Sequence, residues 1–174
     1  MSLLAGMAAA GALLGLIAVG PYVGGENAAC GPDEAGPALK VDVVGLKDRR
    51  GTLRVELYPP NDADFLADDF RLLEAGKSFR RLMIPTPTDT GVQLCIRAPR
   101  PGRYAVAVLQ DRRGGKLKFS PWTDGAGFPG NPRLGTSKPK ASAASIEIGS
   151  GVTTTAITMN YWDGAFGFGP VRRR

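Results

Sequence analysis

The chain has 174 residues, a formal net charge of +6, 24 Gly, 14 Pro, two Cys and no His. This length corresponds to one domain, and the many Gly and Pro favour short strands joined by turns over long helices. Without histidine, the Ser-His-Asp and Cys-His nucleophile systems and all histidine-bearing zinc sites are excluded. The sequence implies no cofactor and predicts a protein that is not an enzyme.

The N-terminal segment indicates export. Residues 1–25 carry no charged side chain, and the stretch from Leu3 to Val19 is apolar. Such a stretch predicts either a cleaved signal peptide or a retained N-terminal membrane anchor. We therefore expect an exported protein, periplasmic or extracellular, held at the inner membrane if the anchor is uncleaved. Residues 26–38 are rich in Gly, Pro and Ala without hydrophobic periodicity, which predicts a linker before a domain over residues 39–174.

The two cysteines, Cys30 and Cys95, both follow the apolar segment. In an oxidising compartment an even number of cysteines favours a disulfide. Cys95 lies on the polar face of the predicted strand 92–97, where its sulfur can meet the segment that contains Cys30. The alternative is two unpaired thiols.

The first elements of the domain are two strands and a helix. Residues 39–44 and 52–58 alternate apolar and polar side chains, and we interpret them as a hairpin around the turn at 47–51. Residues 61–75 have the spacing of a short amphipathic helix, with Asn61 or Asp62 as its N-cap and Gly76 at its end.

The remaining elements are predicted to be strands. Residues 79–84 form a strand whose Arg80 and Arg81 face water, and 92–97 form the strand of Cys95. The longest strand, 103–110, places Tyr104 and Val106 on one face and small or apolar residues on the other, so we expect both faces to be buried. Further strands are expected at 116–119, 145–148 and 153–161, with an irregular loop over 120–140. The pattern predicts an all-β fold, an antiparallel β-sandwich of about seven or eight strands with one short helical excursion. A small barrel is the alternative.

Basic residues outnumber acidic ones after residue 75 and recur in successive turns. In an exported protein they favour an anionic envelope glycan, lipid headgroups or an acidic protein as partner, and no nucleic acid is expected. A solvated surface is the alternative. The candidate contacts to an anionic surface are Arg80, Arg81, Arg112, Arg113, Lys116, Lys118, Arg172, Arg173 and Arg174.

Aromatic residues gather in the long loop and around the last strand: Trp122, Phe128, Tyr161, Trp162, Phe166 and Phe168. The two in the loop, Trp122 and Phe128, are candidates for a platform that contacts a sugar or a partner protein. Packing into the core is the alternative. The surrounding glycine-rich stretch 125–130 lacks the helix and the Lys-Ser/Thr ending of a phosphate-binding loop.

Several motifs together resemble the bacterial domain-of-unknown-function family 2141. They are Pro101-Gly102, Tyr104-Ala105-Val106-Ala107-Val108, Asp111, Gly115-Lys116-Leu117, Gly127-Phe128, Asn131 and Lys138-Pro139. The likeness extends over roughly residues 39–161 and includes the order of strands and loops. The resemblance implies an exported protein with an immunoglobulin-like or prealbumin-like sandwich and no established activity.

The sequence departs from this family after the longest strand. Relatives usually have His-Asp there, followed by a loop with Asn and Asp that resembles a calcium loop. Here Gln110 replaces the histidine, and Arg113 and Lys118 bring positive charge to the loop. Because calcium requires six to eight oxygen ligands, we predict no divalent metal at this turn.

The predicted function is therefore that of a non-catalytic binding or structural module at the cell envelope. An accessory subunit of a membrane complex is the first alternative. The second is a hydrolase that uses carboxylates or a Ser/Lys pair, which the sequence supports least because no acid pair converges.

Overall fold

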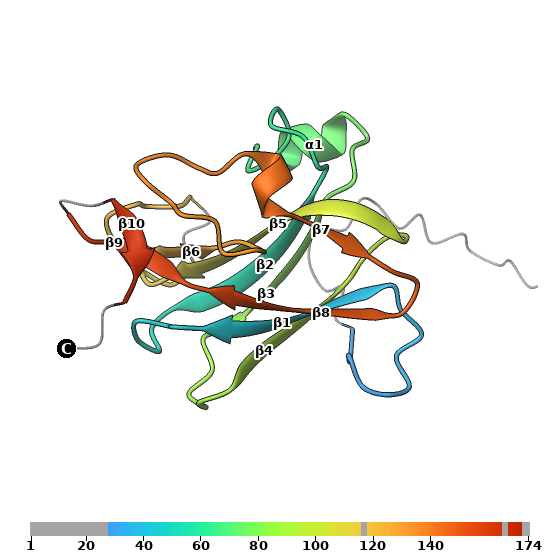
Figure 1. Ribbon diagram of the computed structural model, residues 1–174, viewed down its shortest axis with the longest axis horizontal. Coiled ribbons are helices and arrows are strands. Elements are labelled where there is room, and N and C mark those ends of the chain that lie inside the picture. The colour runs from blue at the N-terminus through green and yellow to red at the C-terminus, as the bar shows by residue number, and fades with distance from the viewer. Residues whose placement is uncertain (1–27, 116–117, 165–166, 172–174) are drawn as a thin grey trace, which may run out of the picture.

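Two β-sheets pack face to face in the computed structural model, which describes residues 28–115, 118–164 and 167–171 (Figure 1). The smaller sheet has the strand order β4 (Val92–Arg97), β1 (Ala38–Val44), β8 (Val152–Thr158). The larger sheet runs β10 (Phe168–Pro170), β9 (Asn160–Trp162), β6 (Gly125–Gly127), β5 (Gly102–Asp111), β2 (Thr52–Tyr58), β3 (Arg80–Pro85), and β7 (Ser145–Ile148) also pairs with β5. The all-β sandwich is confirmed, with ten strands among the described residues and no closed barrel.

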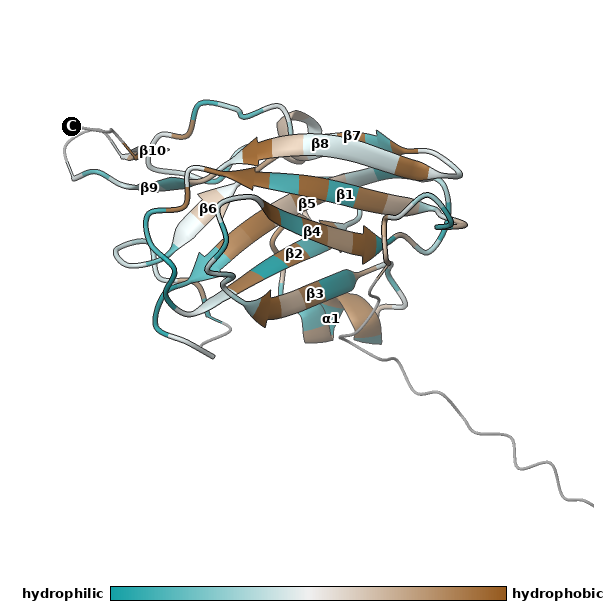
Figure 2. Cartoon of the chain, turned by 90° about the horizontal axis from the view of Figure 1, so that it is seen from below, coloured by the Kyte–Doolittle hydropathy of each residue, from teal (hydrophilic) through white to brown (hydrophobic). Residues whose placement is uncertain are grey.

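The core between the sheets follows from the alternation of side chains along the strands. Apolar side chains of β1 and β4 face the inner side of the larger sheet, and their polar neighbours face water, which produces the stripes of Figure 2. From β5, Tyr104, Val106 and Val108 enter this core. The contact between the two sheets therefore rests on aliphatic residues that the sequence pattern identifies.

A second apolar cluster covers the outer face of the larger sheet. Its floor is formed by Ala105, Ala107 and Leu109 of β5, so both faces of this strand are buried, as predicted. The cover consists of the 59–75 segment with α1 (Asp69–Glu74), the loop before the 3₁₀ helix η1 (Ala141–Ala144), and η1 itself. Figure 1 shows α1 and η1 on the side of the larger sheet that faces away from β1 and β4. This covered face is where the apolar pocket described below is found.

The predicted hairpin of residues 39–44 and 52–58 is wrong, because the two strands belong to different sheets. β1 pairs with β4 and, in parallel, with β8, whereas β2 pairs with β3 and β5. The connection between them crosses from one sheet to the other and bends at Gly45 and Gly51, both at positive φ. The alternation of apolar and polar side chains shows which face of a strand is buried. Because each sheet of a sandwich buries one face, the alternation does not show to which sheet a strand belongs.

The helix is shorter than predicted. α1 spans Asp69–Glu74, its N-cap is Asp68, and Asn61 instead caps a separate turn by accepting the N–H of Asp64 at 3.0 Å. Gly76 ends the helix as predicted, with φ of +65°. The strand expected at 116–119 is absent at 118–119, and residues 116–117 lie outside the described residues.

The segment before β1 is attached to the smaller sheet. Cys30 and Cys95 lie at disulfide distance and are bonded, with their Cα atoms 5.8 Å apart. A second tie is the ion pair between Glu34 and Arg97, at 2.6 Å. The predicted signal peptide or anchor, residues 1–25, lies outside the described residues. Within the described part of the chain, no helix reaches the length and apolarity needed to cross a bilayer.

Candidate functional site

The polar residue at the end of β5, Gln110, belongs to a hydrogen-bond network whose members bond one another. Gln110 is fully buried, and its amide nitrogen donates to the backbone carbonyls of Asp48 at 3.0 Å and Arg50 at 3.1 Å. Its amide oxygen accepts the hydroxyl hydrogen of Tyr161, whose oxygen in turn accepts the N–H of Lys47 at 3.0 Å. Burial raises the pKa of Tyr161 to about 12. Gln110 thus connects the loop between the sheets to β9, and its polar atoms are occupied by structural partners.

The loop after β5 is held by pairs of arginine and carboxylate. The guanidinium of Arg112 bonds the carboxylate of Asp48, which lowers the pKa of Asp48 and raises that of Arg112. Arg113 pairs with Asp124 at 2.9 Å. Asp124, which is 1% exposed, also accepts the N–H of Ser120 at 2.8 Å. Where a calcium loop would present oxygens to an ion, this loop directs its carboxylates toward its own arginines.

A second charged cluster lies on the outer face of β2 and β3. Glu56, 1% exposed, accepts from Nε of Arg81 at 2.6 Å and from the hydroxyl of Tyr58 at 2.6 Å. Nε of Arg54 lies 3.3 Å from the same carboxylate without hydrogen-bond geometry. Burial alone lowers the pKa of Arg81, but the carboxylates of Glu56 and Asp69 outweigh burial and raise it. Burial and the charge of Glu56 raise the pKa of Tyr58, which therefore remains a neutral donor.

The predicted contacts to an anionic surface are distributed over these networks. Arg81, predicted to face water, is mostly shielded from it, with a side chain 12% exposed in an ion pair with Glu56, and Arg112 and Arg113 have carboxylate partners. The side chain of Arg113 is 37% exposed and that of Arg112 is 19% exposed, so both still reach the surface while they pair with carboxylates. Contact of these residues with an anionic surface stays a prediction. Arg80 donates to the backbone carbonyl of Phe79, and Lys118 is exposed. Lys116, Arg172, Arg173 and Arg174 lie outside the described residues.

An open pocket of about 260 Å³ lies on the covered face of the larger sheet. Its floor consists of Leu109 from β5 and Ala126 from β6, and its walls are mostly apolar. The exposed rim carries the polar side chains of Thr136, Ser137 and Lys138. The remaining lining residues are Leu66, Phe119, Pro121, Phe128, Leu134, Pro139 and Phe168.

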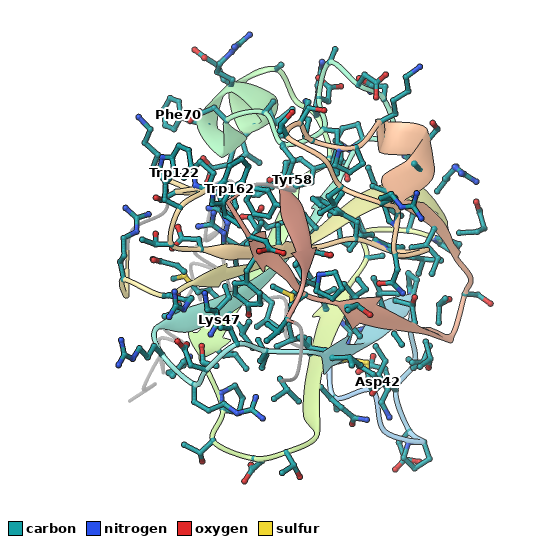
Figure 3. All side chains as sticks on the ribbon, turned by 60° about the vertical axis from the view of Figure 1, so that its left-hand side comes forward. Asp42, Lys47, Tyr58, Phe70, Trp122 and Trp162 are labelled. Carbon is teal, nitrogen blue, oxygen red and sulfur yellow. A yellow bond between two sulfur atoms is a disulfide. The ribbon has the colours of Figure 1, made fainter. Side chains whose placement is uncertain are left out.

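Aromatic rings continue from the pocket onto the surface. The rings of Trp122 and Trp162 meet edge to face with centroids 5.0 Å apart, and Trp162 contacts Phe168 of the pocket wall at 5.8 Å. Figure 3 shows the two tryptophans together, far from Asp42 on the smaller sheet. Trp122 is 71% exposed, whereas Phe128 is buried and forms the pocket wall. The predicted platform of Trp122 and Phe128 is thus divided between surface and pocket.

Trp162 and Phe168 are among the aromatic residues that stand out in the sequence, but the sequence alone did not place them beside Trp122, and Lys138 was missed as a member of this site. Trp162 and Phe168 follow the last long strand, and only the pairing of β9 with β6 and β10 places them beside the long loop. The aromatic residues near the C-terminus indicated that an aromatic site could exist, but they did not show where it lies in the fold. Among the described residues, no group of three or more His, Cys, Asp and Glu could hold a metal ion.

Comparison with known proteins adds one finding. A family model described as "Uncharacterized protein conserved in bacteria (DUF2141)" matches residues 41–156, which extend from β1 into β8 and confirm the resemblance seen in the motifs. No curated protein and no solved structure matches the chain.

Proposed function

We propose a binding function for this chain, which belongs to the bacterial family DUF2141. In this proposal the protein is an exported, non-catalytic module of the cell envelope. Its binding surface consists of the apolar pocket and the aromatic rings beside it, Trp122, Trp162 and Phe168.

The observation that carries the proposal is the exposed indole of Trp122, which is linked through the ring of Trp162 to Phe168 in the wall of the apolar pocket. Exposed tryptophans are uncommon on surfaces without partners, and they are enriched in the centres of binding interfaces. Ligand sites are typically concave and apolar with a few polar groups at defined positions, and this pocket has that composition. By contrast, the polar atoms of Gln110 and the carboxylate of Glu56 are bonded to partners within the protein, which supports a module without catalytic groups.

Export is supported by two features. The disulfide between Cys30 and Cys95 is of the kind that persists in oxidising compartments. The charge-free residues 1–25 have the composition of an export signal or anchor. An anionic envelope component is the partner that the net charge of +6 favours.

The protein contains its own reporter for this test, because its two tryptophans both lie beside the pocket. Periplasmically produced protein is titrated separately with a lipid extract and a solubilised glycan fraction of a bacterial envelope, and tryptophan emission is recorded. We expect a saturable change with at least one fraction. Trp122→Ala should weaken the apparent affinity by at least about fivefold, as for a central aromatic contact. Val44→Ala, which truncates an exposed apolar residue of the smaller sheet, should leave the affinity unchanged.

Two results would contradict the proposal. The first is that neither fraction changes the emission of the folded protein. The second is that Trp122→Ala and Val44→Ala bind as tightly as the unmodified chain, because the emission change would then report an effect away from this surface.

A further inference from the structure

We propose that the pocket binds the hydrocarbon chain of a medium-chain fatty acid and that Lys138 binds its carboxylate. This inference rests on the proposed binding function and names the class of ligand. Three observations lead to it: the volume of the pocket, the apolar character of its walls, and the presence of one cationic residue, Lys138, among those that line it.

The volume limits the ligand to a small hydrocarbon. A cavity of about 150 Å³ lined by apolar side chains takes up benzene, so about 260 Å³ accommodates roughly ten carbon atoms. A leucine or phenylalanine side chain of a partner protein has fewer carbons than this and would leave part of the pocket unfilled. A saturated chain of about ten carbons fills it.

A hydrocarbon chain in the pocket would contact apolar walls, so its binding would not require the desolvation of polar groups there. Leu109 and Ala126 form a sheet floor in which the backbone is already paired between strands. Phe128 and Leu134 are buried behind the opening, and Phe168 connects the wall to Trp162. Dispersion and the hydrophobic effect therefore favour a chain that enters from the rim.

Lys138 gives the rim its charge. Its ammonium donates to the backbone carbonyl of Phe65 at 2.6 Å and lies 3.4 Å from that of Asp62. An ammonium has three N–H donors, so one remains for a ligand. Among the described residues no carboxylate forms an ion pair with Lys138, and the carboxylate of Asp62 is bonded to the N–H of Ala141. Lys138 is thus held in position by neutral carbonyl groups and has no ion-pair partner among the described residues.

One ammonium matches a monocarboxylate better than a phosphate. A phosphate monoester carries a charge of about −1.5 to −2, and proteins usually bind it with several cationic or N–H donors. The rim supplies one cation and the hydroxyls of Thr136 and Ser137. A carboxylate can accept from the ammonium and from a hydroxyl at the same time.

The direct test is a chain-length series measured by calorimetry and by tryptophan emission. Saturated fatty acids of about six to fourteen carbons are used below micelle formation, and affinity should rise about fourfold per methylene up to about ten carbons and then level off. Lys138→Gln should weaken decanoate binding about tenfold and leave decanol binding unchanged, and Lys138→Arg should restore decanoate binding. Ala126→Leu should abolish binding by filling the pocket, whereas Ala156→Leu, on the outer face of β8, should not. If Ala126→Leu fails to fold, Leu134→Phe serves as the filling variant.

Each other outcome overturns the inference. Equal binding of decanoate and decanol, or binding insensitive to Lys138, would refute the carboxylate contact. A lack of chain-length dependence, or full binding by a folded pocket-filling variant, would refute occupation of the pocket. If fatty acids fail while a glycan or a partner peptide changes the emission in a manner dependent on Trp122, the fatty-acid inference is refuted and the binding function stands. If nothing binds, both are refuted.

Discussion

Replacing Glu56 by glutamine should be among the most destabilising single substitutions in this fold, although it changes the shape of the side chain little. Its carboxylate is 1% exposed and pairs with two guanidinium groups, those of Arg81 at 2.6 Å and Arg54 at 3.3 Å. Glutamine leaves these cations under the cover of the outer face, and among the described residues Asp69 remains as the counter-charge of Arg81. Removing one partner of a buried ion pair costs about 3–5 kcal/mol, because the remaining charge is buried and unpaired.

Glutamine can still accept a hydrogen bond, so we expect the lower end of this range, about 3 kcal/mol of the free energy of unfolding. For a domain of this size about 1 kcal/mol corresponds to roughly 2–4 °C, so Tm should fall by about 6–12 °C in thermal unfolding followed by circular dichroism. The matched control is Glu147→Gln, the same change at an exposed position of β7 in the same sheet. It should alter the free energy of unfolding by less than about 0.5 kcal/mol.

The same reasoning ranks the two arginines. Arg54 has no hydrogen bond from Nε, whereas Arg81 bonds both Glu56 and Asp69. Arg54→Met should therefore lower the free energy of unfolding less than Arg81→Met. Glu56→Gln should also lower it less in the Arg54→Met background, because one buried cation fewer is then left unpaired. If Glu56→Gln shifts Tm no more than Glu147→Gln, the cluster is solvated and the argument from burial fails.

Three further predictions concern other parts of the fold. Reducing the bond between Cys30 and Cys95, 65 residues apart, should lower the free energy of unfolding by about 4 kcal/mol in the chain-entropy model, which denaturant titration with and without reductant measures. The pKa of Tyr161 is raised to about 12, above the usual tyrosine value of about 10, so its contribution to the free energy of unfolding is complete below pH 10 and is lost as pH rises toward 12. When stability is measured against pH, Tyr161→Phe should reduce this alkaline loss. Gly127→Ala should lower the free energy of unfolding by about 1–3 kcal/mol, because the added Cβ would lie 2.6 Å from a side-chain carbon of Ile157. Gly169→Ala, with open space around it, should leave Tm nearly unchanged when both variants are unfolded thermally.

The sequence predicted best those features that depend on one strand alone. The two buried faces of β5 could be identified because Tyr104, Val106 and Val108 alternate with small or apolar residues over ten positions. The position of Cys95 on a polar face was predicted in the same way, and it pairs across the sheet with Lys40. Periodicity fixes the side on which a residue lies, and these inferences needed nothing else.

Features that depend on which strands are neighbours could not be predicted. The parallel pairing of β1 with β8 joins segments more than a hundred residues apart, and no local pattern distinguishes it from a hairpin with β2. The aromatic surface has the same origin, since Trp122 and Trp162 approach only because β6 pairs with β9. Turn chemistry was similarly ambiguous at the helix, where Asp68 rather than Asn61 is the cap, because both are good N-cap residues.

The arginines show why net charge alone is a weak guide to a binding surface in this protein. Arg81, Arg112 and Arg113 pair with Glu56, Asp48 and Asp124, each far away in sequence or across a loop, so part of their charge is balanced within the fold. Reversing Arg112 and Arg113 would break these pairs, and a loss of binding to anionic vesicles would then reflect damage to the loop. Lys138 differs because its ammonium is held by backbone carbonyls, which are neutral, and has no ion-pair partner among the described residues. A cation fixed by neutral partners beside an apolar pocket is therefore a better indicator of an anionic ligand than a larger number of arginines that already have carboxylates.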